Sequence, residues 1–256
     1  MRFTAKTASI ALAVTALPGI VALSPALAAA PAAPAAPVAA AGPVTVARYT
    51  FNAGVGATGR VAENSGRGSA LTVRVADRGR VNFAGTPDKA AAFPAACATT
   101  ATLCPRALLE GTDDPDLDPG TKLFRWGVSV RITKAQVTDS SNVIQKGVVA
   151  TDSQWKMQVG PRKGKAQCVV VGQGSTRVYL VRSTVSVADG KWHHIMCQRA
   201  GSTLAVFVDG KARGRVTIPA TVSIANARPL RIGGPNFNNR SDMFHGQLDD
   251  VYARLG

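Results

Sequence analysis

The feature that most constrains the fold is a succession of short runs rich in β-branched residues, separated by Gly, Pro, Asp and Asn. Val44–Phe51, Trp126–Thr133 and Thr203–Val208 are typical of these runs. No window carries a sustained helical repeat of apolar residues with capping residues at its ends. The pattern therefore predicts an all-β fold of many short strands joined by regular turns.

About eleven strands are expected, and the turns between them support the same fold class. Asp209-Gly210 lies between two strand-like runs and readily takes the positive φ angles of a tight hairpin, and Asp189-Gly190 precedes the run at Trp192. So many antiparallel strands in one unit predict a two-sheet sandwich. The expected strands are residues 44–51, 71–75, 126–133, 154–159, 167–171, 177–182, 192–199, 203–208, 215–218, 230–232 and 251–253.

The amino terminus is typical of an export signal and is not expected to belong to the fold. Residues 1–28 run from Arg2 and Lys6 through an apolar stretch to Ala26-Leu27-Ala28, the order of a secretory signal peptide. A retained anchor is the alternative, but Pro18 and Pro25 interrupt the apolar run. Residues 29–42 are nearly all Ala and Pro, which predicts an extended linker. We therefore expect a secreted protein with one domain at residues 43–256 and no membrane span after signal cleavage.

Four cysteines fit an exported protein, because disulfides persist in oxidising compartments. Cys97 and Cys104 have six residues between them in a Pro- and Ala-rich segment, whereas Cys168 and Cys197 each lie in an apolar strand. Three pairings are possible, of which 97–104 with 168–197 is favoured. A cysteine metal site is disfavoured, since the sequence has no CxxC spacing.

The last third of the chain carries a family resemblance in an ordered set of four segments, with two further matches upstream. Together they resemble the laminin G-like, concanavalin A-like jelly-roll family, and in particular its secreted bacterial branch. The resemblance covers residues 43–256 and implies a two-sheet antiparallel jelly-roll sandwich. The matching segments are Asp189–Ile195, Leu204–Gly210, Pro229–Gly234 and Phe244–Val251, with Tyr49–Phe51 and Asn64–Gly68 upstream.

This family contains lectins, adhesins and glycosidases, so the fold does not decide the function. Retaining glycoside hydrolysis needs two carboxylates about 5 Å apart. In enzymes of the family that this chain resembles, these carboxylates lie along one strand with the pattern Glu-x-Asp-x-x-Glu. This chain has only Glu63 and Glu110, neither of them in such a strand. We therefore expect a non-catalytic binding module and no enzyme; a glycosidase of the same fold is the least favoured alternative.

The loop between residues 233 and 242 is the candidate ligand site. Its Asn and Arg side chains can pair with hydroxyl groups, and its Phe can stack on an apolar sugar face. Amide-rich rim loops also resemble the way this family meets its ligands, which implies a carbohydrate or cell-envelope glycan. A plain connecting loop and a protein-interaction or adhesion module remain as alternatives. The candidate residues are Asn236, Phe237, Asn238, Asn239 and Arg240.

The chain is strongly basic, with 30 Lys and Arg against 15 Asp and Glu. Arg2 and Lys6 are the charged residues of the first 42, so the domain keeps 28 basic residues against all 15 acidic ones, a net charge of +13. Outside a cell this charge favours an anionic wall polymer or acidic glycan as partner, although it also serves solubility. No basic helix or interleaved aromatic platform is evident, so no nucleic-acid partner is expected.

The family resemblance implies a structural calcium ion, because related domains hold one near the opening turn and the final strand. The matching positions here are Asn64, where the family more often has Asp, and Asp250. A hydrogen-bonded turn at Asn64 and an ordinary surface acid at Asp250 are the alternative. His193 and His194 cannot chelate one ion together, since adjacent strand residues point to opposite faces. The acidic segment from Asp113 to Asp118 lacks the Gly and Glu of a calcium loop and is expected to be a solvated turn.

Overall fold

The computed structural model describes residues 42–149, 152–238 and 240–256. The expected signal peptide at residues 1–28, and all but the last residue of the expected linker at 29–42, lie outside the described residues. From residue 42 onward the chain groups into one compact unit. Within the described ranges no helix has the length and apolar character needed to cross a membrane.

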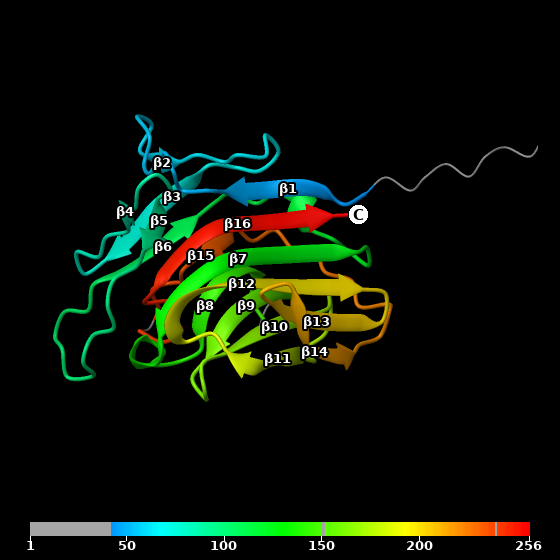
Figure 1. Ribbon diagram of the computed structural model, residues 1–256. Coiled ribbons are helices and arrows are strands. Elements are labelled where there is room, and N and C mark those ends of the chain that lie inside the picture. Colours follow the sequence, from blue (N-terminus) through cyan, green and yellow to red (C-terminus); the bar gives the residue numbers. More distant parts are fainter. Residues whose placement is uncertain (1–41, 150–151, 239) are drawn as a thin grey trace, which may run out of the picture. The chain divides into compact units, whose positions relative to one another are not determined.

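In the described part of the chain, two antiparallel eight-stranded sheets form a sandwich, which confirms the expected jelly-roll architecture (Figure 1). Sheet I contains, in spatial order, β14 (Lys211–Thr217), β13 (Thr203–Val208), β12 (Asp189–Ala200), β7 (Phe124–Thr133), β16 (Gln247–Leu255), β5 (Ala90–Ala92) and β4 (Asn82–Ala84), with β1 (Val44–Tyr49) also pairing with β16. Sheet II contains β11 (Tyr179–Ser186), β10 (Lys165–Val171), β9 (Gln154–Gly160), β8 (Ser141–Gly147), β15 (Leu230–Ile232), β6 (Arg106–Glu110), β3 (Leu71–Ala76) and β2 (Arg60–Val61).

The core lies between the sheets and is built by strand alternation. Every second residue of β7, from Phe124 to Ile132, is fully buried, because successive strand side chains point to opposite faces. The rings of Phe124, Trp126 and Trp155 meet with centroids 5.2–5.6 Å apart. Trp155 belongs to β9 of sheet II, so this aromatic cluster joins the two sheets.

Both favoured disulfides are present. Cys168 of β10 bonds to Cys197 of β12, with a Cα–Cα distance of 5.7 Å, and so links sheet II to sheet I inside the core. Cys97 bonds to Cys104 and closes a short segment between β5 and β6. Neither disulfide leaves a free cysteine in the described residues.

The expected turns and strands are mostly placed correctly, with some differences. Asp209 and Gly210 both have positive φ in the β13–β14 hairpin, as predicted. Asp189-Gly190 instead opens β12, where the pairing with β7 shifts register before Trp192. The sequence pattern missed five strands, namely β2, β4, β5, β6 and β8.

The expectation that the acidic segment is merely a solvated turn is wrong for Asp118. The ammonium of Lys146, a fully buried residue of β8, donates to Asp118 Oδ1 at 2.7 Å and pairs with Asp113 Oδ1 at 2.9 Å. A short 3-10 turn at Pro115–Leu117 holds this segment, with Leu117 in the core. Buried charges require such partners, so Asp118 and Leu117 tie this otherwise exposed segment to the folded interior.

Candidate functional site

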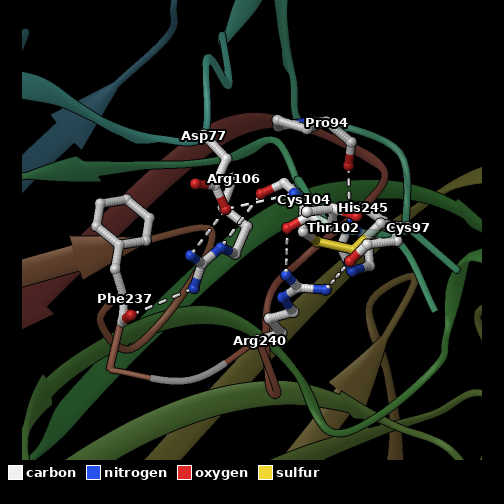
Figure 2. Close-up of a disulfide and its surroundings, with 10 residues drawn as sticks. Asp77, Pro94, Cys97, Thr102, Cys104, Arg106, Phe237, Arg240 and His245 are labelled. Carbon is white, nitrogen blue, oxygen red and sulfur yellow. Dashed lines mark hydrogen bonds and ion pairs between the residues drawn. A yellow bond between two sulfur atoms is a disulfide. The ribbon is translucent and has the colours of Figure 1, made fainter. Parts of the chain in front are cut away.

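The predicted rim loop connects β15 to β16 and is anchored to the segment that holds the Cys97–Cys104 disulfide (Figure 2). The guanidinium of Arg240 donates to the carbonyl oxygens of Ala101 at 2.6 Å and Thr102 at 2.9 Å. These bonds hold the loop against the disulfide segment. A hollow of about 330 Å³ lies between the two segments, and Arg240 is among its lining residues.

Phe237 and Asn236 also have internal contacts. Arg106 of β6 donates to the carbonyl oxygen of Phe237 at 3.2 Å, and its guanidinium lies 5.6 Å from the centre of the Phe237 ring. Asn236 Oδ1 accepts from the backbone N–H of Asn238, which is the side-chain turn typical of Asn. Of the five predicted ligand residues, Asn238 and Arg240 are exposed and Asn239 lies outside the described residues. The loop is thus a braced rim in which Phe237 and Arg240 already have partners.

A set of polar side chains lies on the outer side of sheet II, where the amide residues Asn142, Gln145, Gln158 and Gln167 are each only 2–6% exposed. Cross-strand partners in antiparallel pairs share a face, and one row of partners runs unbroken across all eight strands. Trp155, Met157 and Ile232, which alternate with members of this row, point into the core, so the row points outward. Its members are Leu180, Val169, Lys156, Gln145, Arg231, Glu110, Thr72 and Arg60.

A second row of amides and a guanidinium lies beside the first, two residues further along β9. It consists of Arg182, Gln167, Gln158 and Asn142. We refer to these four residues, together with Lys156, Gln145, Arg231 and Glu110, as the polar face. The Gln158 amide nitrogen donates to Gln167 Oε1 at 2.7 Å, and Asn142 donates to Gln145 Oε1 at 2.9 Å. These bonds fix the orientation of the amides.

Gln158 has an acceptor that the protein does not use. Its side chain is 6% exposed, and its Oε1 has no hydrogen-bond donor among the described residues. Leaving a buried acceptor unpaired costs about 1–3 kcal/mol. Gln158 also lines a hollow of about 690 Å³, although its Oε1 atom is itself shielded from solvent.

The hollow is basic. Four of its lining residues are Arg162, Lys163, Lys165 and Arg182, and none is acidic. Burial lowers the pKa of the neighbouring Lys156, with the carboxylate of Asp242 opposing that effect. The concentration of positive charge favours an anionic or hydroxyl-rich ligand.

The polar face does not carry the carboxylate pair that glycoside hydrolysis needs. Glu110 is its one carboxylate among the described strand residues, and Arg231 binds it at 2.8 Å while Arg74 lies 3.7 Å away. Glu63 accepts hydrogen bonds from the backbone of Arg48, Ser65 and Gly66. Although burial opposes the shift, these bonds and the Ser65 hydroxyl lower the pKa of Glu63, so it serves the opening turn.

The two predicted calcium ligands are engaged in other contacts. Asn64 Oδ1 accepts from the backbone N–H and the hydroxyl of Thr50, at 3.0 and 3.2 Å. Asp250 Oδ1 accepts from the guanidinium of Arg48 at 2.9 Å. The cationic place beside Asp250 is therefore taken by Arg48, and within the described ranges no cluster of three His, Cys, Asp or Glu side chains adds ligands. This arrangement does not fit a calcium site.

Lys156, Gln158 and Gln167 were not among the predicted site residues, although the sequence carries a signal for them. In Gln154-Trp155-Lys156-Met157-Gln158-Val159, polar and apolar residues alternate strictly, which indicates a strand with one polar face. What the pattern lacks is the register that brings β8, β9 and β10 together.

A family model agrees with this architecture. The model of the concanavalin A-like lectin/glucanases superfamily matches residues 124–253, about half of the chain. No curated protein matches the chain. The matched segment contains β7 to β15 and most of β16, and therefore includes the strands that carry Lys156, Gln158 and Gln167.

Solved structures share the fold at low sequence identity. Domain 4 of AbnA, a GH43 extracellular arabinanase from Geobacillus stearothermophilus solved with arabinotriose, is 15% identical with a TM-score of 0.62, over 84% of this chain and 93% of that one. The binding domain of Paraclostridial Mosquitocidal Protein 1 is 10% identical with a TM-score of 0.58, over 82% of this chain and 48% of that one. The binding domain of botulinum neurotoxin DC, solved with SialylT, is 11% identical with a TM-score of 0.56, over 82% and 47%. The chain thus spans about half the length of these two toxin domains.

Proposed function

Since the chain belongs to the concanavalin A-like lectin/glucanases superfamily, we propose that it is a secreted, non-catalytic module that binds carbohydrate on the polar face of sheet II. The observation that carries this proposal is the basic hollow of about 690 Å³ that is lined by the amide residues Gln158 and Gln167 and by four Lys and Arg residues. Fixed amides and guanidinium groups are suited to hydroxyl and carboxylate groups of a glycan. The loop from Asn236 to Arg240 would form one rim of the site.

An anionic glycan, such as an acidic cell-envelope polymer, suits this hollow better than a neutral one. Arg162, Lys163, Lys165 and Arg182 line it without an acidic neighbour in the lining. Secretion is part of the proposal and rests on the signal-like residues 1–28; the two disulfides are consistent with it. A structure similar to this fold has been solved with arabinotriose, which supports a sugar as the class of ligand.

A glycan array probed with the purified domain at about 50 mM and about 500 mM NaCl tests the proposal. We expect acidic glycans to be retained at low salt and retained more weakly at high salt, because surface charges are screened. Retention of no glycan at either salt concentration would contradict carbohydrate binding. Incubation with every retained glycan should release no reducing ends, since the polar face lacks a carboxylate pair; release would restore the glycosidase alternative.

A further inference from the structure

A second groove lies on the opposite side of the sandwich, on the outer face of sheet I. Trp192 of β12, Arg131 of β7 and Gln247 of β16 are cross-strand partners and form one row there. Two hollows, of about 380 and 390 Å³, both include Arg131 and Gln247 in their lining. They therefore meet at these two side chains, and we call the combined feature the Trp192 groove. Each hollow lies within the size range of small-molecule sites, about 300–1,000 Å³.

Trp192 is the unusual residue of this groove. It is 42% exposed, whereas Trp126 and Trp155, the other two tryptophans of the chain, are fully buried. The guanidinium of Arg131 lies 5.4 Å from the centre of the indole ring and holds it in place through a cation–π contact. An exposed, fixed indole at the wall of a hollow offers an apolar surface at little entropic cost.

The polar groups at the Trp192 end differ from those of the polar face. Asp88 and Asp249 line this hollow with Gln247. Burial raises the pKa of Asp249, and the nearby carboxylates of Asp250 and Asp88 add to that effect. Carboxylate and amide oxygens accept hydrogen bonds from sugar hydroxyls, but their negative charge disfavours an anionic ligand.

We propose that the Trp192 groove binds a neutral oligosaccharide, with a sugar ring against Trp192 and its hydroxyls bonded to Asp249, Gln247 and Arg131. The two adjacent hollows, which share Arg131 and Gln247 as lining residues, give room for a sugar residue on either side of these side chains. The domain would then carry two glycan sites of different charge preference on opposite sheets. This inference does not rest on the polar face, since it uses none of its residues.

Tryptophan fluorescence tests the proposal in the unmodified protein. Because Trp192 is the exposed tryptophan, quenching by acrylamide reports on it selectively. The probes are arabinotriose, cellotriose, maltotriose and mannotriose at about 10 mM, enough to fill most of a site with a dissociation constant of about 1 mM. We expect at least one of them to reduce the quenching constant about twofold, unchanged by salt. Failure of all four to protect Trp192 would overturn the proposal.

Three variants separate this groove from the polar face, with binding read by saturation-transfer NMR. Trp192→Ala should abolish the signal of the protecting sugar and Trp192→Phe should retain part of it, while Arg182→Met on the polar face should leave it unchanged. Each variant should melt within a few degrees of the wild type, because both side chains point away from the core. Undiminished binding by Trp192→Ala, or loss of binding in Arg182→Met, would contradict a separate site. If the wild-type protein retained no acidic glycan but a neutral trisaccharide still protected Trp192, the proposed function would be refuted and this inference would stand.

Discussion

The side-chain oxygen of Gln158 has no hydrogen-bond donor among the described residues because of the way its amide pairs with Gln167. Its nitrogen is committed to Gln167 across the β9–β10 pair, so its oxygen must point elsewhere. The alternating pattern of residues 154–159 was sufficient to predict a strand with one polar side. The partner Gln167 lies on the next strand, and only the register of the pair shows that the two amides meet.

The buried position of Lys146 and its acidic partners could not be predicted from the sequence. It occupies an inward position of β8 opposite Trp155, where an apolar residue would be expected. Its partners Asp113 and Asp118 lie about 30 residues earlier, in a segment that reads as a solvated turn. Long-range charge pairing of this kind leaves no periodic trace in the sequence.

His193 bridges two carboxylates and gives a pH-dependent contribution to stability. Its Nδ1 lies 2.8 Å from Asp209 Oδ2 and its Nε2 lies 3.0 Å from Asp189 Oδ1. Although burial opposes the shift, these hydrogen bonds raise the pKa of His193. A raised pKa in the folded state means that the contribution is complete below the unfolded value of about 6.5 and is lost as pH rises through the folded value.

The variant His193→Gln should therefore lower Tm more at about pH 5.5 than at about pH 8. The carboxylates of Asp189 and Asp209 remain charged at both values, because the pKa of each is lowered. Both carboxylates are substantially exposed, so the difference should be small. An equal loss of Tm at the two pH values would show that the imidazolium contributes nothing.

At the scale of elements, the strands that sequence missed are those whose composition does not favour a strand. β5 is Ala-Ala-Ala and β6 is Arg-Ala-Leu-Leu-Glu, residues that prefer helices in isolation. β8 intersperses Ser, Asn, Gln and Lys with two apolar residues. Pairing within the sheets overrides these local preferences, whereas the β-branched strands β7 and β13 were predictable.

The two disulfides should contribute unequally to stability. Cys168–Cys197 spans a separation of 29 residues and joins the sheets, which corresponds to about 3.6 kcal/mol of loop-closure entropy in the unfolded chain. Cys97–Cys104 spans seven, which corresponds to about 2.4 kcal/mol. Urea unfolding of the paired Cys→Ala variants should rank them in this order. A larger loss from the 97–104 pair would show that the disulfide segment holds more of the fold than its length implies.

The β1–β16 pair is expected to be stable without calcium. The Arg48–Asp250 ion pair and the Thr50–Asn64 hydrogen bonds already satisfy both predicted ligands. Addition of a chelator should leave Tm unchanged, and addition of about 5 mM calcium chloride should not raise it, because a ligand that binds only the folded state stabilises it measurably when it exceeds its dissociation constant. A rise of several degrees with calcium would show that Arg48 yields its place to the ion.

At the scale of the whole molecule, the +13 charge of residues 43–256 is not spread evenly. The hollow in sheet II is lined by basic residues without acids, whereas the Trp192 groove includes Asp88 and Asp249. The fold and the net charge were both evident from the sequence. The division of that charge between two opposite faces was not, because it depends on which strands become neighbours.

The most direct test of carbohydrate binding by the polar face is the affinity of one acidic glycan, taken from the array, for two matched variants. Gln158→Ala removes an amide side chain that lines the hollow, and Gln198→Ala makes the same change on the outer face of sheet I. Isothermal titration calorimetry should show binding weakened about tenfold in Gln158→Ala, the equivalent of about one hydrogen bond, and unchanged in Gln198→Ala. Wild-type affinity in Gln158→Ala, or an equal loss in both variants, would contradict the assignment of the site to the polar face.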